Sequence, residues 1–314
     1  MRILVTGGAG FIGSHVCAVL AGAGHEVLAL DDLSRGRREN VPSGVGLAKA
    51  DLCDRPALER VLAEFRPEAV DHHAAQVSVR DSVADPVRDA QINVIGGLNL
   101  LETCMAQGVK RFLLASTGGA IYGEQERFPA GEDHPAQPLS PYGIAKLALE
   151  KYLFFYEKTY SLAWTALRYS NVYGPRQDPF GEAGVVAIFT ERMLAGQTPL
   201  INGDGEQTRD FVYVGDVARA NLLALQTGAT GPINIATGRE TSIVQIFNLL
   251  RELTGAKVNE EHGPAKPGEQ RRSVLDPARA LRQLQWRPQV EIREGLQTTV
   301  EYFRGTKNRK GRDR

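Results

Sequence analysis

The chain has 314 residues, of which 42% are hydrophobic and 24% charged, and its 37 basic residues balance its 37 acidic ones. This length and composition are typical of a globular protein with a sizeable core, built as one large α/β unit or two modest domains. Balanced charge provides no overall field for nucleic acid or a membrane surface, so neither partner is expected.

Strands and helices alternate through the first half of the chain. Short apolar runs predict strands at 3–5, 27–30, 69–70, 111–115 and 163–167. Apolar residues at helical spacing predict helices at 13–22, 58–65, 93–107 and 141–160, with Ser140 as the N-cap of the last one and Pro141 at its first position. This alternation indicates an α/β fold with a parallel sheet and helices on both faces.

The pattern changes near residue 170, where glycine and proline become denser and loops lengthen. We expect a first domain at 1–170, joined by returning segments from 211–240, and a smaller C-terminal α/β domain at 171–304. The segments 211–214 and 233–235 are candidate strands of either domain. Residues 305–314 carry five basic residues against Asp313, and we expect a disordered, solvated tail there.

A glycine-rich loop joins the first predicted strand to the first predicted helix. Gly7 permits a tight turn, Gly10 lets backbone approach a pyrophosphate, and Gly13 lets helix and strand pack closely. The helix N-terminus, near Phe11 and Ile12, offers free N–H groups and partial positive charge to phosphates. This context predicts a dinucleotide site on a doubly wound parallel sheet of the Rossmann type.

Carboxylates follow the second predicted strand at Asp31 and Asp32. Asp31 lies 18 residues beyond Gly13, where a carboxylate accepts ribose hydroxyls and repels a 2′-phosphate, which favours NAD over NADP. Three arginines follow closely and keep NADP open, namely Arg35, Arg37 and Arg38. Further on, Asp51, next to Leu52, either binds the adenine amino group or caps the following helix.

Tyr142 and Lys146 lie four residues apart on a predicted helix, so their side chains share one face. A neighbouring ammonium and a nicotinamide cation both favour the phenolate, so the pair can take a proton from a hydroxyl while hydride leaves for NAD. The spacing alone is common on exposed helix faces. The glycine loop and the Ser116-Thr117-Gly118 strand end favour the catalytic interpretation.

Together these residues resemble the extended short-chain dehydrogenase/reductase family, which includes nucleotide-sugar epimerases and dehydratases. The resemblance covers nearly the whole chain and rests on residues 6–13, Asp31, His73-Ala74-Ala75, Asn93, Ser116-Thr117, Tyr142, Lys146, residues 168–174 and Arg209-Asp210-Phe211. It implies a tightly held NAD, a C-terminal nucleotide-sugar domain and a homodimer formed through a helix bundle. Within the family the likeness is greatest to UDP-hexose 4-epimerases, which oxidise C4, rotate the 4-keto sugar and return hydride to the other face.

The resemblance also implies residue roles. The residues implied to lie at the cofactor are His73, Ala74, Ala75, Gln76, Asn93 and Tyr169, besides those of the glycine loop, Asp31, Asp32, Asp51, Leu52, Tyr142 and Lys146. The residues implied to bind the UDP-sugar are Thr117, Gly118, Tyr142, Asn171, Val185, Arg209, Lys266, Glu269 and Ser273. An arginine such as Arg209 suits a diphosphate because its planar fork donates two parallel hydrogen bonds.

Departures from the family pattern narrow the activity. Gly118 stands where the family usually has Ser or Thr, so we assign the third catalytic hydroxyl to Thr117, with Ser116 in reserve. Dehydratases carry Asp-Glu at Gly119-Ala120 and decarboxylases a Glu at Ala120, so both activities are disfavoured. Ser273 matches a gate position where a small residue leaves room for an N-acetyl group or is merely a packing residue.

Two other enzyme activities remain open, a net oxidoreductase such as a 4-keto-sugar reductase and a UDP-glucuronate 4-epimerase; a non-catalytic dinucleotide-binding regulator is the third alternative. Neither the histidines nor the three cysteines have metal-ligand spacing, so no metal is expected. Widely spaced, odd-numbered cysteines and the lack of a signal peptide predict a cytoplasmic protein.

Overall fold

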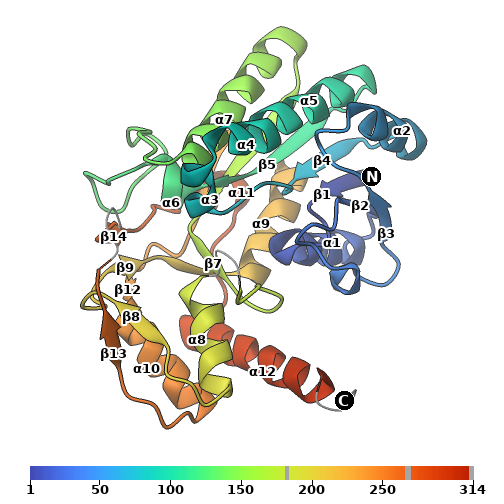
Figure 1. Cartoon of the computed structure of the whole chain (residues 1–314). Coiled ribbons are helices and arrows are strands. Elements are labelled where there is room, and N and C mark those ends of the chain that lie inside the picture. Colours follow the sequence, from blue (N-terminus) through green and yellow to red (C-terminus); the bar gives the residue numbers. More distant parts are fainter. Residues whose placement is uncertain (181–183, 266–269, 311–314) are drawn as a thin grey trace.

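A seven-stranded parallel sheet forms the centre of the larger part of the molecule (Figure 1). The computed structural model describes residues 1–180, 184–265 and 270–310. The strand order is β11 (Gly231–Ile235), β6 (Ala163–Tyr169), β5 (Arg111–Thr117), β4 (Ala69–His72), β1 (Arg2–Thr6), β2 (Glu26–Asp31) and β3 (Gly46–Lys49). The order reverses between β1 and β4, which creates a crevice at the carboxyl ends of the strands.

Helices cover both faces of this sheet. One apolar layer contains α1 (Phe11–Gly22), α9 (Val214–Thr227) and α11 (Ala278–Leu284). The other contains α2 (Arg55–Phe65), α5 (Gly96–Ala106) and α7 (Pro141–Tyr160). Along β1, Ile3 and Val5 enter the first layer and Leu4 the second, because successive side chains of a strand point to opposite faces. The predicted doubly wound α/β fold is therefore confirmed.

Four short elements pack against α7, namely α3 (Val79–Ala84), α4 (Pro86–Ala90), η2 (Gln91–Ile95) and α6 (Gly118–Ile121). A fifth, η1 (Arg38–Asn40), follows β2 and is hydrogen-bonded to Ala9 of the glycine loop. The predicted helix at 93–107 is thus divided, because η2 is a π-helix that precedes α5. A π-helix has about one more residue per turn than an α-helix, so its side chains point in different directions. Short π-helical segments are frequent at functional sites.

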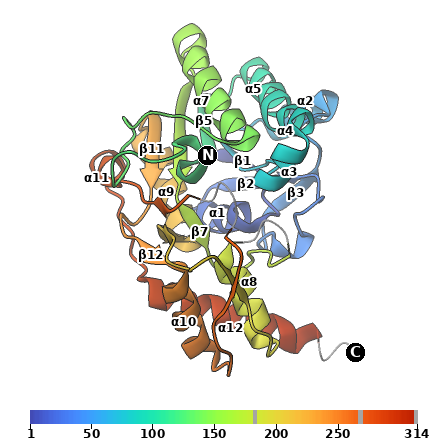
Figure 2. The same cartoon turned by 60° about the vertical axis from the view of Figure 1, so that its left-hand side comes forward.

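A smaller part of the molecule packs below the sheet around its own core (Figure 2). Its helices are α8 (Val185–Leu194), α10 (Ile243–Thr254) and α12 (Ile292–Lys310). Its strands are β7 (Asn171–Tyr173), β8 (Leu200–Asn202), β9 (Thr208–Arg209), β10 (Phe211–Tyr213), β12 (Thr241–Ser242), β13 (Glu261–Gly263) and β14 (Arg272–Ser273). The two candidate strands at 211–214 and 233–235 belong to different sheets. β10 pairs with β7, whereas β11 joins β6 in the large sheet.

The end of the chain differs from the expected disordered tail. Helix α12 runs to Lys310, so residues 305–310 are helical, and residues 311–314 lie outside the described part. Among the described residues, no helix is long and apolar enough to cross a membrane. Nor do these residues include a group of three or more His, Cys, Asp or Glu placed to hold a metal.

Candidate functional site

A cavity of about 1390 Å³ lies where the parallel strands end. Its wall includes residues that follow or end β1, β2, β4, β5 and β6, and residues of α8, β8, β9 and α12 from the smaller part. The carboxyl ends of parallel strands, beside the switch in strand order, are where open α/β sheets bind ligands. The cavity therefore brings the predicted dinucleotide loop and the predicted substrate residues to one place.

The glycine loop between β1 and α1 has the geometry of a phosphate site. Gly7 has φ +66, and a Cβ there would lie 2.7 Å from the Ala74 nitrogen. A Cβ on Gly13 would lie 2.2 Å from the Gly7 carbonyl oxygen. Gly10 is the N-cap of α1, and no side chain of the described residues caps this helix. Its first N–H groups are therefore left for an anion.

Asp31 lies on the cavity wall and is held in place by backbone. Its Oδ2 accepts a hydrogen bond from the Ala9 amide at 3.0 Å and its Oδ1 one from the Leu33 amide at 2.9 Å. Burial raises the pKa of this carboxyl, whereas the two amides lower it. Each carboxylate oxygen has a second lone pair, so Asp31 can still accept two hydroxyl groups.

Asp51 also lies on the cavity wall, beside Leu52. Its Oδ1 accepts a hydrogen bond from the Cys53 amide at 2.8 Å. Helix α2 is instead capped by Asp54, which accepts from the Ala57 amide at 3.0 Å. The helix-cap alternative for Asp51 is therefore wrong, and its place in the cavity fits the adenine interpretation.

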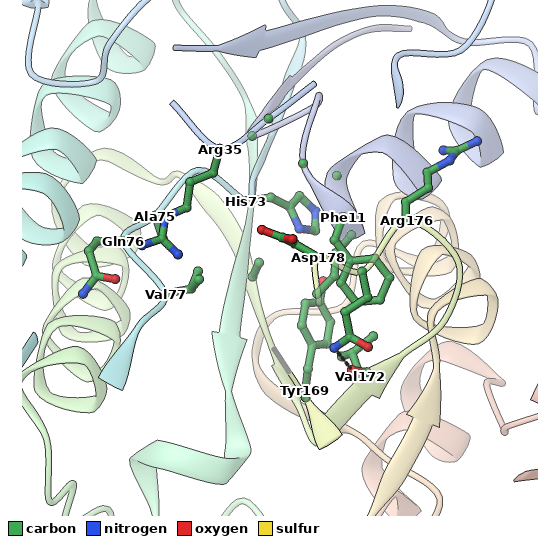
Figure 3. A pocket seen from close by; sticks show the side chains of 18 of the residues that line it. Phe11, Arg35, His73, Ala75, Gln76, Val77, Tyr169, Val172, Arg176 and Asp178 are labelled. Atoms are coloured by element: carbon green, nitrogen blue, oxygen red, sulfur yellow. Dashed lines mark hydrogen bonds between the residues drawn. The ribbon is translucent and has the colours of Figure 1, made fainter. Parts of the chain in front are cut away.

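The loop after β4 supplies His73, Ala74, Ala75 and Gln76 to the wall. His73 lies on the same side of the cavity as Phe11 and Tyr169 (Figure 3). Its ring stacks on Tyr169 with centroids 6.3 Å apart, and its Nε2 lies 2.9 Å from Oδ1 of the fully buried Asp71. His73 is thus held from two sides.

Asn93 is not among the described residues that line the cavity. Its Oδ1 accepts from the Gln76 amide at 2.9 Å, and its Nδ2 donates to the Gln76 carbonyl at 2.9 Å and to Oδ1 of Asp89 at 2.9 Å. These hydrogen bonds give Asn93 a supporting role, and its expected contact with the cofactor stays a prediction. Asn93 lies in η2 and fixes the loop that carries Gln76.

Tyr142 and Lys146 face the cavity from the first turns of α7, where Ser140 caps the helix. The Lys146 Nζ donates to the Ala115 carbonyl at 2.9 Å and lies 6.0 Å from the centroid of the Tyr142 ring. Burial lowers the pKa of Lys146 to about 8, against the opposing effect of Asp89 and Glu150. Burial and the Asp89 charge raise the pKa of Tyr142. Without a ligand, Tyr142 is therefore a neutral phenol.

The two hydroxyl candidates at the end of β5 differ in their surroundings. Ser116 Oγ donates to Glu150 Oε1 at 2.6 Å, and Glu150 is also bound by Arg168 through two hydrogen bonds of 3.0 and 2.6 Å. Thr117 lies on the cavity wall, and its Oγ1 accepts from the Ala120 amide at 3.3 Å. The hydroxyl proton of Thr117 is therefore available for donation to a ligand, whereas that of Ser116 is already donated to the Glu150 carboxylate.

Gly118 is buried at the start of α6 and is not among the described residues of the cavity wall. A Cβ there would lie 2.2 Å from Cδ1 of Leu275, itself buried. Gly118 is therefore closely packed against Leu275, and its expected contact with the substrate stays a prediction.

On the substrate side, Asn171, Val185 and Arg209 line the cavity. The Arg209 Nη1 donates to the carbonyls of Thr208 at 2.8 Å and Gln270 at 2.9 Å. Ser273 is buried in β14 and pairs in register with Arg209, behind the described wall, and its expected contact with the substrate stays a prediction. Lys266 and Glu269 fall outside the described residues.

Several side chains at the cavity were not foreseen. Glu150 follows Lys146 by one helical turn, and Asp89 precedes Asn93 by one turn, so helical spacing could have suggested both. Arg35 extends toward the loop of Ala75 (Figure 3) and pairs with Asp81 at 3.2 Å. Because Arg35 and Asp81 lie far apart in the sequence, spacing alone could not have predicted this contact.

Comparisons with known proteins agree with this geometry. The model of the NAD dependent epimerase/dehydratase family matches residues 3–236. A curated UDP-glucose 4-epimerase of Mycolicibacterium smegmatis is 46% identical over 310 residues, covering 97% of this chain and 99% of the relative. The UDP-glucose 4-epimerase of Thermotoga maritima, solved with UDP-glucose, is 52% identical with a TM-score of 0.95, covering 98% and 99% of the two chains. That of Thermus thermophilus, solved with NAD, is 50% identical with a TM-score of 0.92, covering 97% and 99%.

Proposed function

Because the chain belongs to the NAD-dependent epimerase/dehydratase family, we propose that it interconverts UDP-glucose and UDP-galactose by inverting C4 of the sugar. The chain is an NAD-dependent epimerase, and the proposal concerns its substrate and the roles of its residues. The observation that carries it is the Tyr142–Lys146 pair beside Thr117, in one cavity with the phosphate loop and Arg209. Relatives named as UDP-glucose 4-epimerases along the whole chain support the same substrate.

The described residues fit NAD on three observations. The uncapped N-terminus of α1 and the close approach at Gly7 suit a pyrophosphate. The fixed carboxylate of Asp31 suits an adenosine ribose and disfavours a 2′-phosphate. The loop from His73 to Gln76, with Tyr169, borders the remaining length of the dinucleotide. When bound, NAD supplies a reversible hydride acceptor for C4 of the sugar.

Tyr142 is the proposed acid and base. The nicotinamide cation and the Lys146 ammonium both favour its phenolate, offsetting the burial that raises its pKa. The phenolate takes the proton of the sugar 4-hydroxyl as C4 is oxidised, and returns it when the 4-keto sugar is reduced on its other face. Thr117 donates its hydroxyl proton to the same sugar oxygen and orients it.

The smaller part of the molecule is the proposed nucleotide-sugar site. Residues 1–170, together with the segments of 211–240 that return to the large sheet, would then form the NAD domain. The rest of 171–304 would form the UDP-sugar domain. Arg209 and Asn171 are the proposed diphosphate ligands, and Val185 a neighbour of the same ligand. Diphosphate binding at this end leaves the hexose beside Tyr142.

We also propose a homodimer through the outer face of α7. Large apolar side chains are exposed there, at Ile144, Tyr152, Phe154, Phe155 and Tyr160. Contiguous apolar patches of this kind mark interaction sites on soluble proteins. A two-fold axis would pair this face with itself.

The proposal is tested by incubating purified protein with UDP-galactose, without added cofactor, and measuring UDP-glucose formation. Conversion is expected, because the dinucleotide is regenerated in each turnover. A second arm with UDP-N-acetylgalactosamine tests acceptance of the acetyl group. If neither sugar is converted even with NAD supplied, the proposed substrates are wrong; a requirement for stoichiometric reduced dinucleotide would indicate a net reductase.

The Tyr142→Phe variant separates chemistry from binding. We expect at least about a 100-fold loss of turnover, since general acid–base groups contribute about 10²–10⁴-fold, with unchanged NAD content and thermal midpoint. Tyr152→Phe, on the exposed face of the same helix, is the matched control and keeps its activity. Near-normal turnover by Tyr142→Phe would show that another residue is the base.

A further inference from the structure

Asp89 is a buried carboxylate on the cavity wall to which no role has yet been given. It is 1% exposed. Its Oδ1 accepts hydrogen bonds from Gln76 Nε2 at 3.0 Å and from Asn93 Nδ2 at 2.9 Å. Its Oδ2 is buried and has no hydrogen-bond partner among the described residues. A buried charged oxygen without a partner is costly, so something at this site compensates it.

The candidate for the compensating charge lies on α7, against which α4 packs and with which it shares the cavity wall. Lys146 is the cation there, and Asp89 and Glu150 are the two carboxylates that raise its pKa. They are not equivalent, because Glu150 is already bound by Arg168 through two hydrogen bonds and by Ser116. Asp89 receives only neutral amide donors. Asp89 is therefore the carboxylate whose charge is left for Lys146.

We propose that Asp89 is a positioning residue whose carboxylate acts as the counter-charge of Lys146 and thereby sets the ionisation of the Tyr142–Lys146 pair. This inference rests on the proposed roles of Tyr142 and Lys146. The same charge lies on the wall of the dinucleotide cavity. It therefore also favours a cationic nicotinamide over a neutral one, since opposite charges in a poorly solvated site attract strongly.

Other charges near Asp89 do not replace it. On α3, Asp81 is exposed and paired with Arg35, and Arg80 is exposed. On α4 itself, Asp85 and Arg88 are exposed. The sequence of η2 contains no charged residue. Of the charged groups named here, only Lys146 is buried and also acts on Asp89 through its charge, which lowers the pKa of that carboxyl.

The sign of the effect of Asp89 follows from its charge. The Asp89 charge raises the pKa of Tyr142 and also that of Lys146. Removing it favours the phenolate and disfavours the ammonium, so both pKa values fall. Turnover needs the phenolate and the ammonium together, so both limits of the pH profile move to lower pH. A purely structural defect lowers the height of the profile and leaves its limits in place.

The first experiment measures kcat against pH for the wild type, Asp89→Asn and Asp89→Glu. We expect both limits to move down by about one pH unit in Asp89→Asn, a tenfold change in each ionisation, and to return toward the wild type in Asp89→Glu. Asp54→Asn is the matched control, because Asp54 is the exposed N-cap of α2, is not among the described residues of the cavity wall, and can be replaced by an asparagine that caps equally well. Unmoved limits in Asp89→Asn overturn the proposal.

The second experiment does not depend on turnover. Dissociation constants of NAD⁺ and NADH are measured by calorimetry on protein stripped of its dinucleotide. Asp89→Asn is expected to weaken NAD⁺ binding relative to NADH binding by about tenfold, a coupling of ordinary size, whereas Asp54→Asn leaves the ratio unchanged. An unchanged ratio in Asp89→Asn counts against the proposal.

The two experiments separate the failure of this inference from that of the proposed function. If the wild type converts neither UDP-sugar, the proposed function fails while the affinity ratio still tests Asp89. If Asp89→Asn does not fold, Asp89→Gln and Asp89→Glu give the same comparison, because they share one length and differ in charge. Equal pH limits and equal affinity ratios in that pair overturn the role of Asp89.

Discussion

Gly118 stands where the family resemblance implies a hydroxyl, and the space beyond its Cα is filled by Leu275. A Cβ would lie 2.2 Å from Leu275 Cδ1 and 3.1 Å from its Cδ2. Leu275 belongs to a small buried cluster with Tyr122, Ala130 and Ala236, so its side chain has little room to turn. A hydroxyl side chain at position 118 would thus collide with the core, and of the two hydroxyls at the end of β5 only that of Ser116 is bound to Glu150.

Restoring that hydroxyl should destabilise the protein. Gly118→Ser is expected to lower the free energy of unfolding by about 1–3 kcal/mol, the usual cost of overpacking a core. Leu275→Val removes the two Cδ atoms, so Gly118→Ser combined with Leu275→Val should recover part of this loss. Urea unfolding of the four members of the cycle measures the coupling. Additive effects would mean that the two side chains do not compete for space.

Single residues differ in how far the sequence reveals them. Tyr142 and Lys146 were predicted because helical spacing fixes their common face, and the structure places both on the cavity wall. The choice between Thr117 and Ser116 was not decided by spacing. It depends on Glu150, which reaches Ser116 across 34 residues of chain. Asp89 is partly hidden for the same reason, since spacing suggests its partner Asn93 one turn away but not its partner Gln76 in the loop after β4.

At the scale of elements, α1 is fixed against the sheet by glycines. Gly13 packs on the backbone of Gly7, and a Cβ at position 13 would lie only 2.2 Å from the Gly7 carbonyl oxygen. A backbone atom cannot move aside as a flexible side chain does. The position of the helix N-terminus and the turn at Gly7 therefore depend on each other.

Two glycines of α1 should respond oppositely to alanine. Gly13→Ala is expected to destabilise the fold by about 1–3 kcal/mol and to weaken NAD binding at least about tenfold, because the phosphate turn must shift. Gly22→Ala meets no atom within 4 Å and should stabilise the helix by about 0.5–1 kcal/mol. Thermal unfolding and NAD titration measure both. Equal effects would show that close packing at Gly13 is unimportant.

Most elements of the first half follow from periodicity, because buried parallel strands read as short apolar runs and the helices as amphipathic segments. The exceptions have physical causes. No residue type in η2 marks it as a π-helix, so the apolar pattern alone predicted a single helix at 93–107. The basic end of α12 reads as a tail by composition, although its helix continues to Lys310.

At the scale of the whole molecule, the exposed face of α7 should control assembly. Phe155→Glu places two carboxylates close to each other across a two-fold axis. Like charges juxtaposed at an interface cost several kcal/mol, so we expect dimer dissociation to rise at least about 100-fold. Light scattering should then give the mass of one chain. Leu281→Glu, an exposed apolar residue on α11 in the other layer, is the control.

A monomeric wild type would contradict the proposed dimer. Domain organisation was hard to predict from the sequence, because the residues of a strand do not reveal the sheet to which it belongs. The segments at 211–214 and 233–235 have similar composition, yet β10 pairs with β7 and β11 with β6. Only long-range pairing decides between them.

The position of β11 at the far edge of the sheet also fixes an order of events during synthesis. Strand β6 ends at Tyr169, and its neighbour β11 begins at Gly231. A ribosome must therefore add about sixty further residues before that side of β6 is covered. During this interval β6 is an uncovered edge, which is an aggregation hazard. A fragment ending at residue 170 would keep that edge permanently, so the boundary at which the chain changes character is a poor place to cut it.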